Sequence, residues 1–342
     1  MSRVRIPLLA VDGGGTKCLA AFVDREGRII GTGRAGSCNH QVTGPAAAAR
    51  ELAEAIGKAM SETVTAASDL AKGAVSDLAK HGEWEVECAV FGLAGLDTAR
   101  DRQIILQLVS GVLAELRIRA EHLIVENDGF AALLGATGGK AGVLIIAGTG
   151  SIAYGINQQG VTARAGGWGH RVGDEGSGYW IGKQMIAAVF QAADGRGEPT
   201  ALSEQLLAHL GLSQLEDLYN WLYGSSYSVE KVGELSPLVS RAAAAGDAVA
   251  ARILNLAAGE LFQAARAVIS RLGLRNQPYT LMLQGGVLQH DEQLRRLVVE
   301  QVRHFSPRVI VDTARHEPIT GVIAKGLAYL DKRQQPGADD GQ

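Results

Sequence analysis

The sequence has few cysteines, no long apolar run and little net charge. The three cysteines, Cys18, Cys38 and Cys88, are odd in number and form no CxxC pair. Neither a disulfide framework nor a zinc site is therefore expected. We expect free thiols, as in proteins of a reducing compartment. No apolar stretch approaches the roughly 20 residues that span a bilayer. At a net charge of −3, the chain lacks a basic field for nucleic acid or an anionic membrane. These absences predict a cytoplasmic protein that binds neither.

Glycine, in contrast, is abundant. The chain has 44 glycines among 342 residues, a length that suits two domains better than one core. The glycines gather in short runs after apolar strands, where a backbone turns sharply or approaches a ligand closely. The apolar segment Ile6–Val11, which could be mistaken for part of a signal peptide, runs directly into such a glycine run and is predicted to be a buried strand.

The two halves of the chain follow the same order of strands and turns. In the first half, an apolar strand leads into the turn Asp12–Thr16, and two further strands follow. In the second half, strand Val143–Ala147 leads into the turn Gly148–Ser151, again ahead of a return strand. Later segments carry matching glycines, Phe91–Gly95 in the first half and Leu283–Val287 in the second. The sequence therefore predicts a duplicated βββαβα unit.

This duplication predicts two domains with a cleft between them. The expected boundaries are 1–126 for the first domain and 127–332 for the second, which carries a helical insertion at about 175–272. The final helix is expected to pack back toward the first domain, and the polar tail 333–342 is expected to be disordered. Segment 66–81 is expected to be a helical extension or surface insertion without chemistry.

Two glycine hairpins indicate a phosphate site. Without Cβ atoms, backbone N–H groups can approach phosphate oxygens closely. Each hairpin alone could be an ordinary turn, and the Walker A pattern GxxxxGK[ST] is missing, but two hairpins at matching places in a duplicated unit favour one polyphosphate ligand. Asp12, at the strand end, is placed to hold Mg²⁺ directly or through water. The residues expected to bind the phosphates are Gly13, Gly14, Gly15, Thr16, Gly148, Thr149 and Gly150.

A third glycine pattern is predicted to be unrelated to nucleotide binding. Gly31–Gly36 matches the dinucleotide fingerprint GxGxxG, but that fingerprint requires the glycines to open a helix. The chain continues instead with the polar, non-periodic segment Ser37–His40. No Rossmann-type site is expected here.

Two segments carry candidate acceptor-binding groups. Asp128 lies between an apolar strand and a helix, where an Asp either caps the helix or takes the proton of an attacking hydroxyl; both roles stay open. In the glycine-rich loop Gly166–Gly178, Trp168 offers a flat face for a sugar ring. The carboxylates Asp174 and Glu175 can bind sugar hydroxyls, or one of them simply starts the next helix.

With these motifs the chain resembles the N-acetylglucosamine kinases of the BadF/BadG/BcrA/BcrD ATPase family, from Leu9 to about Lys325. The resemblance implies an α/β fold of the duplicated ribonuclease H-like kind, the two-domain actin/hexokinase-like fold with a cleft. It also implies an ATP-dependent kinase that phosphorylates the 6-hydroxyl of an amino sugar, with N-acetylglucosamine as the first choice. The expected cofactors are ATP and Mg²⁺, and the expected assembly is a homodimer.

The resemblance further implies roles for individual residues. The two hairpins would hold the ATP phosphates, and adenosine would lie beside Gly285 and Gly286. Asp128 would contact the sugar and act as the catalytic base. The remaining sugar-binding residues implied by the resemblance are Asn39, His40, Gly167, Trp168, Gly169 and Asp174.

Several alternatives stay open. The acceptor could be glucosamine, N-acetylmannosamine, N-acetylmuramic acid or glucose. An ATP-driven electron-transfer activase would need cluster-binding cysteines in a pattern that these three do not show. A non-enzymatic actin-like or chaperone ATPase would turn over ATP without regard to sugar. A sugar-responsive repressor of the ROK type is disfavoured, since no DNA-binding helical module precedes Leu8 and the zinc-binding cysteine cluster is missing.

Overall fold

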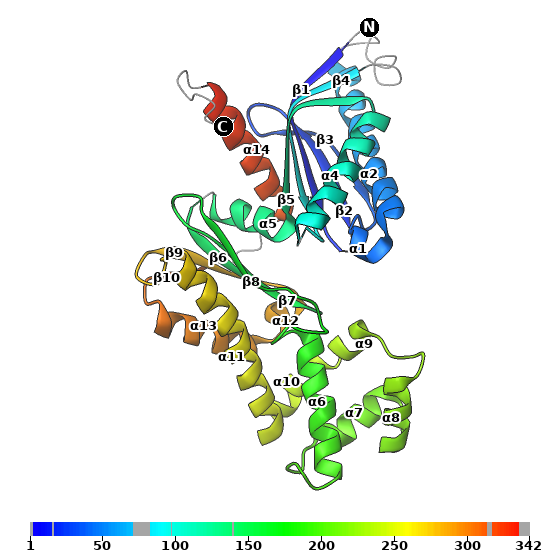
Figure 1. Ribbon diagram of the computed structural model, residues 1–342, viewed down its shortest axis with the longest axis vertical. Helices are drawn as coiled ribbons and strands as arrows, with labels where there is room; N and C mark the ends of the chain where they lie inside the picture. The colour runs from blue at the N-terminus through cyan, green and yellow to red at the C-terminus, as the bar shows by residue number, and fades with distance from the viewer. Residues whose placement is uncertain are drawn as a thin grey trace. The chain divides into compact units, whose positions relative to one another are not determined.

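The computed structural model describes residues 3–15, 17–70, 83–96, 98–138, 140–312 and 317–334. They form two compact units (Figure 1). The first unit combines Met1–Gly139 with Arg315–Gln342, and the second is the continuous segment Lys140–Ala314. Most of the expected insertion at 66–81 and of the expected tail lies outside the described residues, which stop at Leu70 and Gln334 on these two segments.

The first unit is built on a five-stranded sheet of order β3-β2-β1-β4-β5. Strand β1 pairs antiparallel with β2 and parallel with β4, while β2 pairs antiparallel with β3 and β4 pairs parallel with β5. The strand bounds are β1 Arg3–Gly13, β2 Cys18–Val23, β3 Ile29–Ala35, β4 Glu83–Leu93 and β5 Ile118–Asn127. The central strand β1 is apolar and fully buried from Leu8 to Val11, as expected for a strand covered on both faces.

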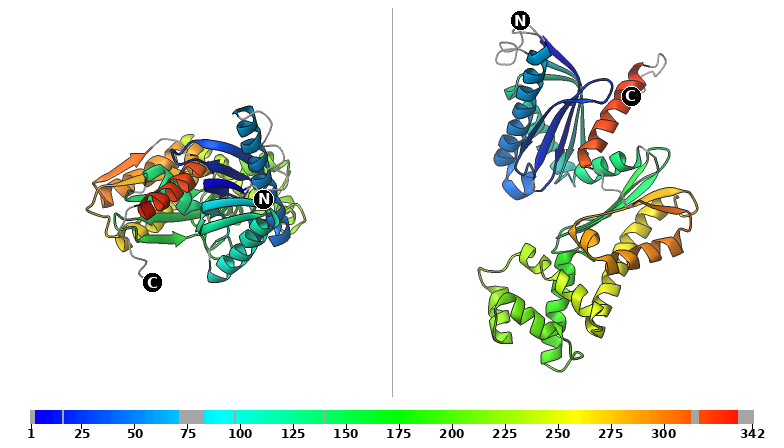
Figure 2. Two further views of the ribbon diagram at one scale, coloured as in Figure 1. Left: turned by 90° about the horizontal axis from the view of Figure 1, so that it is seen from above. Right: turned by 180° about the vertical axis from the view of Figure 1, so that it is seen from behind.

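Helices cover both faces of this sheet (Figure 2). On one face, α2 and α4 enclose a core that includes Phe22, Trp84 and Phe91. On the other face, α5 and α14 pack over Leu8 and Val90. The helix bounds in this unit are α1 His40–Thr43, α2 Pro45–Leu70, α4 Ala99–Glu115, α5 Asp128–Thr137 and α14 Pro318–Gln334.

The first two glycines of the GxGxxG pattern, Gly31 and Gly33, lie in β3, where they allow α2 to approach the sheet. A Cβ atom on Gly33 would lie 2.0 Å from the carbonyl oxygen of Ala55 in α2, and one on Gly31 would lie 2.1 Å from Oγ1 of Thr63. These glycines open no helix. The expectation that the pattern is not a dinucleotide fingerprint is confirmed, and its physical reason is close packing of a helix on a strand.

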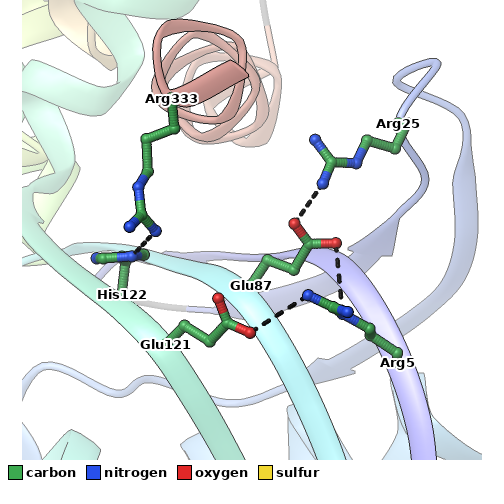
Figure 3. Close-up of polar contacts among 6 residues, drawn as sticks. All are labelled: Arg5, Arg25, Glu87, Glu121, His122 and Arg333. Atoms are coloured by element: carbon green, nitrogen blue, oxygen red, sulfur yellow. Dashed lines mark hydrogen bonds and ion pairs between the residues drawn. The ribbon is translucent and has the colours of Figure 1, made fainter. Parts of the chain in front are cut away.

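Polar contacts join the first sheet to its surroundings on the side of α14 (Figure 3). Glu87 of β4 pairs with Arg25, and it also lies 3.8 Å from Nε of Arg5. Arg333, near the end of α14, contacts His122 of β5. Such exposed contacts contribute little individually, about 0–1 kcal/mol. The buried apolar side chains between α14 and the sheet therefore supply most of the packing energy.

The second unit repeats the first strand for strand. Its sheet has the order β10-β9-β6-β7-β8, in which β6 pairs antiparallel with β7 and parallel with β9, while β7 pairs antiparallel with β8 and β9 pairs parallel with β10. The bounds are β6 Gly142–Ala147, β7 Ser151–Ile156, β8 Thr162–Gly166, β9 Tyr279–Gln284 and β10 Val309–Asp312. The predicted duplication of a βββαβα unit is confirmed.

The helical segment between β8 and β9 is much longer than its counterpart in the first unit. Its last helix, α11, packs on the sheet together with α13, while α6, α7, α9 and α10 pack on one another and on α11. None of the described helices is long and apolar enough to cross a membrane. The helix bounds are α6 Gly178–Ala193, α7 Leu202–Leu210, α8 Leu215–Tyr223, α9 Val229–Gly233, α10 Ser236–Ala244, α11 Ala248–Arg271, α12 Gly286–His290 and α13 Glu292–Phe305.

Candidate functional site

In the first unit, strand register brings two predicted site segments to one edge of the sheet. Gly13 at the end of β1 pairs with Leu93 of β4, and Leu93 pairs with Asn127 at the end of β5. Parallel strands present their carboxyl ends at the same edge, where ligands of α/β proteins commonly bind. The first hairpin, which follows β1, and Asp128, which follows β5, therefore leave the sheet at this edge, with only β4 between them.

Asp12 is a buried carboxylate in this edge. Burial raises its pKa from 3.8 to about 6, with Lys17 opposing and Glu317 adding to the rise. Its side chain forms no hydrogen bond with any other described residue. A buried acid without a donor fits a cation, and Mg²⁺ is usually held by one or two carboxylates together with substrate phosphates and water. No group of three or more His, Cys, Asp or Glu in the described ranges could hold a metal alone.

The first hairpin is joined to the segment that carries Asn39. The N–H of Gly14 donates to the Lys17 carbonyl at 2.9 Å. The Ser37 hydroxyl donates to the Gly14 carbonyl at 3.5 Å and accepts the N–H of Asn39 at 3.3 Å. One serine thus fixes the Asn39 segment against the hairpin. Thr16, also predicted to bind phosphate, lies outside the described residues.

Asn39 begins the short helix α1. Its Oδ1 accepts the N–H of Gln41 at 2.9 Å. Because the amide oxygen is used in this cap, the Nδ2 group is the part of Asn39 suited to donate to a ligand hydroxyl or carbonyl. The side-chain amide of Gln41 in turn donates to the carbonyl of Gly95 at 3.3 Å, which ties α1 to the loop after β4.

His40 has a partner that the sequence did not reveal. Its ring is buried, and its Nε2 lies 3.4 Å from Oδ1 of Asp101 in α4. Asp101 forms a capping box with Thr98. Burial alone would raise the pKa of Asp101, but hydrogen bonds from Thr98, Gln41 and His40 hold it below its ordinary value. The buried ring is suited to hold the Asn39 segment in place.

The structure shows which residue caps the helix that begins at Asp128. The N-cap of α5 is Asn127, whose Oδ1 accepts the N–H of Gly129 at 2.9 Å. Asp128 is the first residue of the helix, and its own Oδ1 lies 2.9 Å from the same N–H. Capping is therefore the task of Asn127.

In the second unit, the Gly148–Gly150 hairpin is held by the start of α6. The Gly148 carbonyl accepts the N–H of Gly178 at 2.8 Å, and the Thr149 carbonyl accepts the N–H of Tyr179 at 3.4 Å. The N-cap of α6 is Ser177, whose Oγ accepts the N–H of Trp180. Neither Asp174 nor Glu175 begins this helix.

Asp174 lies against the same hairpin. Its Oδ1 accepts the N–H of Ser151 at 3.4 Å, and the Ser151 hydroxyl donates to the Glu175 carbonyl at 2.7 Å. The backbone of Asp174 is left-handed, with φ of 59°, which is uncommon for a residue other than glycine. Burial raises the pKa of its carboxyl. This buried acid thus faces the predicted phosphate hairpin of its own unit.

Trp168 is the most exposed of the predicted sugar-binding side chains in this loop, with 65% of its surface accessible. The guanidinium of Arg164 lies 4.8 Å from the centre of its ring, and the flanking Gly167 and Gly169 both have positive φ. The guanidinium fixes the indole through a cation–π contact, and the exposed indole surface is suited to stacking on a sugar ring.

A cavity of about 730 Å³ adjoins this hairpin, within the second unit. Its size is that of a small-molecule site. Helices α9 and α10 of the insertion supply one wall, which the sequence did not predict because helix packing in an insertion leaves no local motif. Asp291 connects α13 to α10, because it is the N-cap of α13 and its side chain contacts the hydroxyl of Ser240. The lining residues are Gly148, Thr149, Glu230, Gly233, Glu234, Ser236, Pro237, Ser240, Arg241, Gly286, Val287, His290 and Asp291.

The predicted double glycine borders this cavity. Gly285 has φ of 90°, and a Cβ atom there would lie 2.3 Å from the carbonyl oxygen of Ala147. Gly286 has no atom within 4 Å of an added Cβ and lines the cavity itself. The first glycine is therefore required by the fold, while the second leaves backbone open to a ligand.

Two sheets with one strand topology, each with a glycine hairpin after its first strand, define the duplicated ribonuclease H-like fold, which solved structures similar to this chain share. The chain belongs to the BadF/BadG/BcrA/BcrD ATPase family, whose sequence profile matches residues 9–323.

Two relatives with assigned names are similar to most of the chain. The chain is 36% identical over 260 residues to an N-acetylmuramic acid/N-acetylglucosamine kinase of Clostridium acetobutylicum, covering 74% of this chain and 82% of the relative. It is 32% identical over 322 residues to an N-acetyl-D-glucosamine kinase of Dictyostelium discoideum, covering 93% and 97%. A solved structure from Chromobacterium violaceum, described as a candidate N-acetylglucosamine kinase, superposes with a TM-score of 0.65 at 24% identity and covers 94% and 98%, which supports the fold.

Proposed function

We propose that this protein is an ATP-dependent kinase that transfers the γ-phosphoryl group to the 6-hydroxyl of an amino sugar, with N-acetylglucosamine as the preferred acceptor. The observation that carries the proposal is the 730 Å³ cavity that adjoins the Gly148–Gly150 hairpin. Membership of the ATPase family and the names of two relatives support ATP as donor and an amino sugar as acceptor.

The nucleoside of ATP would occupy this cavity. Gly286 offers uncovered backbone for close approach, and carboxylates such as Glu230 and Glu234 can accept hydrogen bonds from ribose hydroxyls. Backbone N–H groups of the adjoining hairpin would donate hydrogen bonds to the phosphate oxygens. Asp12 would hold Mg²⁺, which neutralises charge on the β and γ phosphates when bound.

Asn39, Trp168 and Asp128 would bind the acceptor. The Asn39 amide would donate to a sugar oxygen, and the Trp168 indole would stack on the ring or its acetamido methyl group. Asp128 would orient the 6-hydroxyl and accept its proton late in the reaction. Because the transition state of phosphoryl transfer is loose, orientation contributes more than base strength.

His40, Asp174, Gly167 and Gly169 would act mainly by positioning. His40 is buried against Asp101, and Asp174 is buried against Ser151. We propose that these contacts hold Asn39 and the second hairpin in place. The two loop glycines would set the orientation of Trp168 through their left-handed backbone.

A sugar panel tests the proposal. The purified protein with Mg²⁺ and ATP would be given N-acetylglucosamine, N-acetylmuramic acid, glucosamine, N-acetylmannosamine and glucose in an ADP-release assay. We expect the highest kcat/KM with N-acetylglucosamine, and a 6-phosphate by NMR of the product. ATP turnover at one slow rate with every sugar would contradict the proposal and support an actin-like ATPase.

We also propose that the enzyme is a cytoplasmic homodimer that uses Mg²⁺. Free cysteines support a reducing compartment, since Cys18, Cys38 and Cys88 are all unpaired and buried. Light scattering after size exclusion would give the mass, with twice 35.9 kDa expected. A colourless preparation free of iron would exclude the activase alternative.

A further inference from the structure

A second cavity of the second unit, of about 480 Å³, has a different chemistry from the first. It is formed by the end of α11, the turn that leads into β9, and the end of α13. Its main lining residues are Arg266, Ser270, Arg275, Asn276, Gln277 and Phe305. We infer that this cavity binds a small phosphate monoester such as a sugar phosphate, at a site separate from the nucleotide cavity.

The cavity holds two arginines and no acid. The guanidinium carbons of Arg266 and Arg275 lie 5.6 Å and 4.6 Å from the ring centre of Phe305. No carboxylate lines the cavity, and within the described ranges neither arginine forms an ion pair. Both positive charges lie near the Phe305 ring without a counterion among the described residues, and a bound anion would supply one.

The guanidinium groups are also held in place. Nε of Arg275 donates to the Phe305 carbonyl at 3.3 Å, and the cation–π contacts with the ring restrict both side chains. Ser306 fixes the turn, because its hydroxyl donates to the Arg275 carbonyl at 2.7 Å. Pre-positioned guanidinium forks suit phosphate oxygens, which they bind with two parallel hydrogen bonds.

The remaining polar groups favour a phosphorylated polyol over a bare anion. Ser270 carries a hydroxyl and Asn276 and Gln277 carry amides, which can both donate to and accept from sugar hydroxyls. The backbone turn is itself supported by Arg308, whose NH1 donates to the Asn276 carbonyl at 3.3 Å. A volume of about 480 Å³ accommodates a hexose phosphate.

A structural role alone would explain part of this cluster. Cations near a helix C-terminus interact favourably with its dipole, and Arg271 at the end of α11 fits that role, since its NH1 donates to the Arg164 carbonyl at 2.8 Å. Arg266 lies more than one turn before that end, and Arg275 lies beyond it. Their place against Phe305 in a cavity is not required for capping.

No lining residue is shared by the two cavities, so binding at the second can be measured separately. Isothermal titration without ATP would use N-acetylglucosamine 6-phosphate, inorganic phosphate and unphosphorylated N-acetylglucosamine. The variants would be Arg266→Gln and the double variant Arg266→Gln/Arg275→Gln. Arg296→Gln is the matched control, because it removes an exposed charge of α13 outside the cavity, 3.9 Å from Glu300.

We expect the sugar phosphate to bind the wild-type protein and Arg296→Gln alike. We expect at least a tenfold weaker affinity in Arg266→Gln and no detectable binding in the double variant, with kcat and the KM for ATP unchanged in both. The single variant keeps the test decisive if the double variant unfolds. Binding of inorganic phosphate with equal affinity would support the anion site and identify phosphate itself as the ligand.

Two results would overturn the inference. One is the absence of binding by either phosphate compound to the wild-type protein. The other is sugar-phosphate binding of equal affinity in Arg266→Gln and wild type, which would place the ligand elsewhere. Neither result would affect the proposed kinase activity, which the sugar panel tests independently.

Discussion

The carboxylate of Asp174 accepts the backbone N–H of Ser151 and thereby joins the Gly166–Gly178 loop to the second glycine hairpin. The contact is buried, and Asp174 reaches it from a left-handed backbone. This acid is therefore positioned by its own strained conformation to support the hairpin that is proposed to bind phosphate.

Replacement of Asp174 should weaken ATP binding. Asp174→Gly keeps the left-handed backbone without strain but removes the carboxylate, and we expect the KM for ATP to rise about tenfold, since a hydrogen bond to a charged group is worth roughly 1.5 kcal/mol. Asp174→Asn retains an acceptor and should stay close to wild type. A rise in the KM for sugar alone would instead show that Asp174 binds the acceptor.

Asp128→Asn should reduce kcat while leaving ATP affinity and stability intact. A general base typically contributes 10² to 10⁴ in rate, and we expect a loss of about 10³-fold in the ADP-release assay. The helix should stay capped because Asn127, not Asp128, is its N-cap. Asn127→Ala is the control, with a loss of about 1 kcal/mol of stability and a smaller effect on kcat. Wild-type turnover in Asp128→Asn would remove Asp128 from the mechanism.

Asp12→Asn should stabilise the metal-free protein and strongly reduce its activity. Burial raises the pKa of Asp12 from 3.8 to about 6, so the unfolded chain ionises this carboxyl at a lower pH than the folded protein does. Stability therefore falls as pH rises from about 4 to about 6, and the cost, roughly 3 kcal/mol, persists above pH 6.

Urea unfolding in EDTA between pH 4 and pH 8 measures this effect. The asparagine variant should lack the fall that Asp12 contributes and should be more stable than wild type at pH 8. Its kcat with Mg²⁺ should drop by about a hundredfold or more, because a bound metal ion supplies several kcal/mol of charge stabilisation. An active variant would exclude Asp12 as a metal ligand.

Loss of the His40–Asp101 contact should raise the KM for the sugar and leave the KM for ATP unchanged. In Asp101→Ala we expect the KM for N-acetylglucosamine to rise about tenfold with kcat little changed, because the Asn39 segment loses the support of His40. Thr98→Ala is the matched control: it removes the other half of the capping box, about 1 kcal/mol of stability, and leaves the imidazole contact. Equal KM values in the two variants would assign the effect to helix stability.

The double glycine gives a paired test of the nucleotide cavity. Gly285→Ala should destabilise the protein by several kcal/mol, since its Cβ would lie 2.3 Å from the Ala147 carbonyl oxygen at a φ of 90°. Gly286→Ala should fold normally, because nothing lies within 4 Å of its Cβ, and should bind ATP more weakly. Thermal unfolding separates the two effects from titration with ATP. Unchanged ATP affinity in Gly286→Ala would contradict the assignment of this cavity.

The fold could be predicted from the sequence because its units are local and repeated. Short stretches of sequence show the glycine hairpins and the apolar strands ahead of them. The spacing between the strands of the second half shows the long insertion. The sequence also showed that the GxGxxG segment is not a dinucleotide fingerprint, because no helix follows its glycines. The reason for these glycines, close contact with Ala55, could be seen only in the packed structure.

The site was less accessible to sequence reasoning where partners are distant along the chain. His40 and Asp101 are 61 positions apart, and Ser240 meets Asp291 across 51, so no local pattern joins them. The Thr98–Asp101 capping box is visible as a spacing, but nothing in it points to His40. The role of Asp128 stayed open for a subtler reason, because Asn127 and Asp128 are both good caps and only the backbone shows which one begins the helix.

The first unit is composed of two chain segments separated by the whole of the second, and helix α14 completes its core. During synthesis β1 and β4 emerge well before α14, so Leu8 and Val90 lack one of their two covering helices until α14 has left the exit tunnel. The second unit, being continuous, has no such delay. The first unit therefore cannot finish folding until the second unit has been synthesised, and removal of α14 should affect the sheet of β1 to β5 before it affects the second unit, which precedes α14 in the chain.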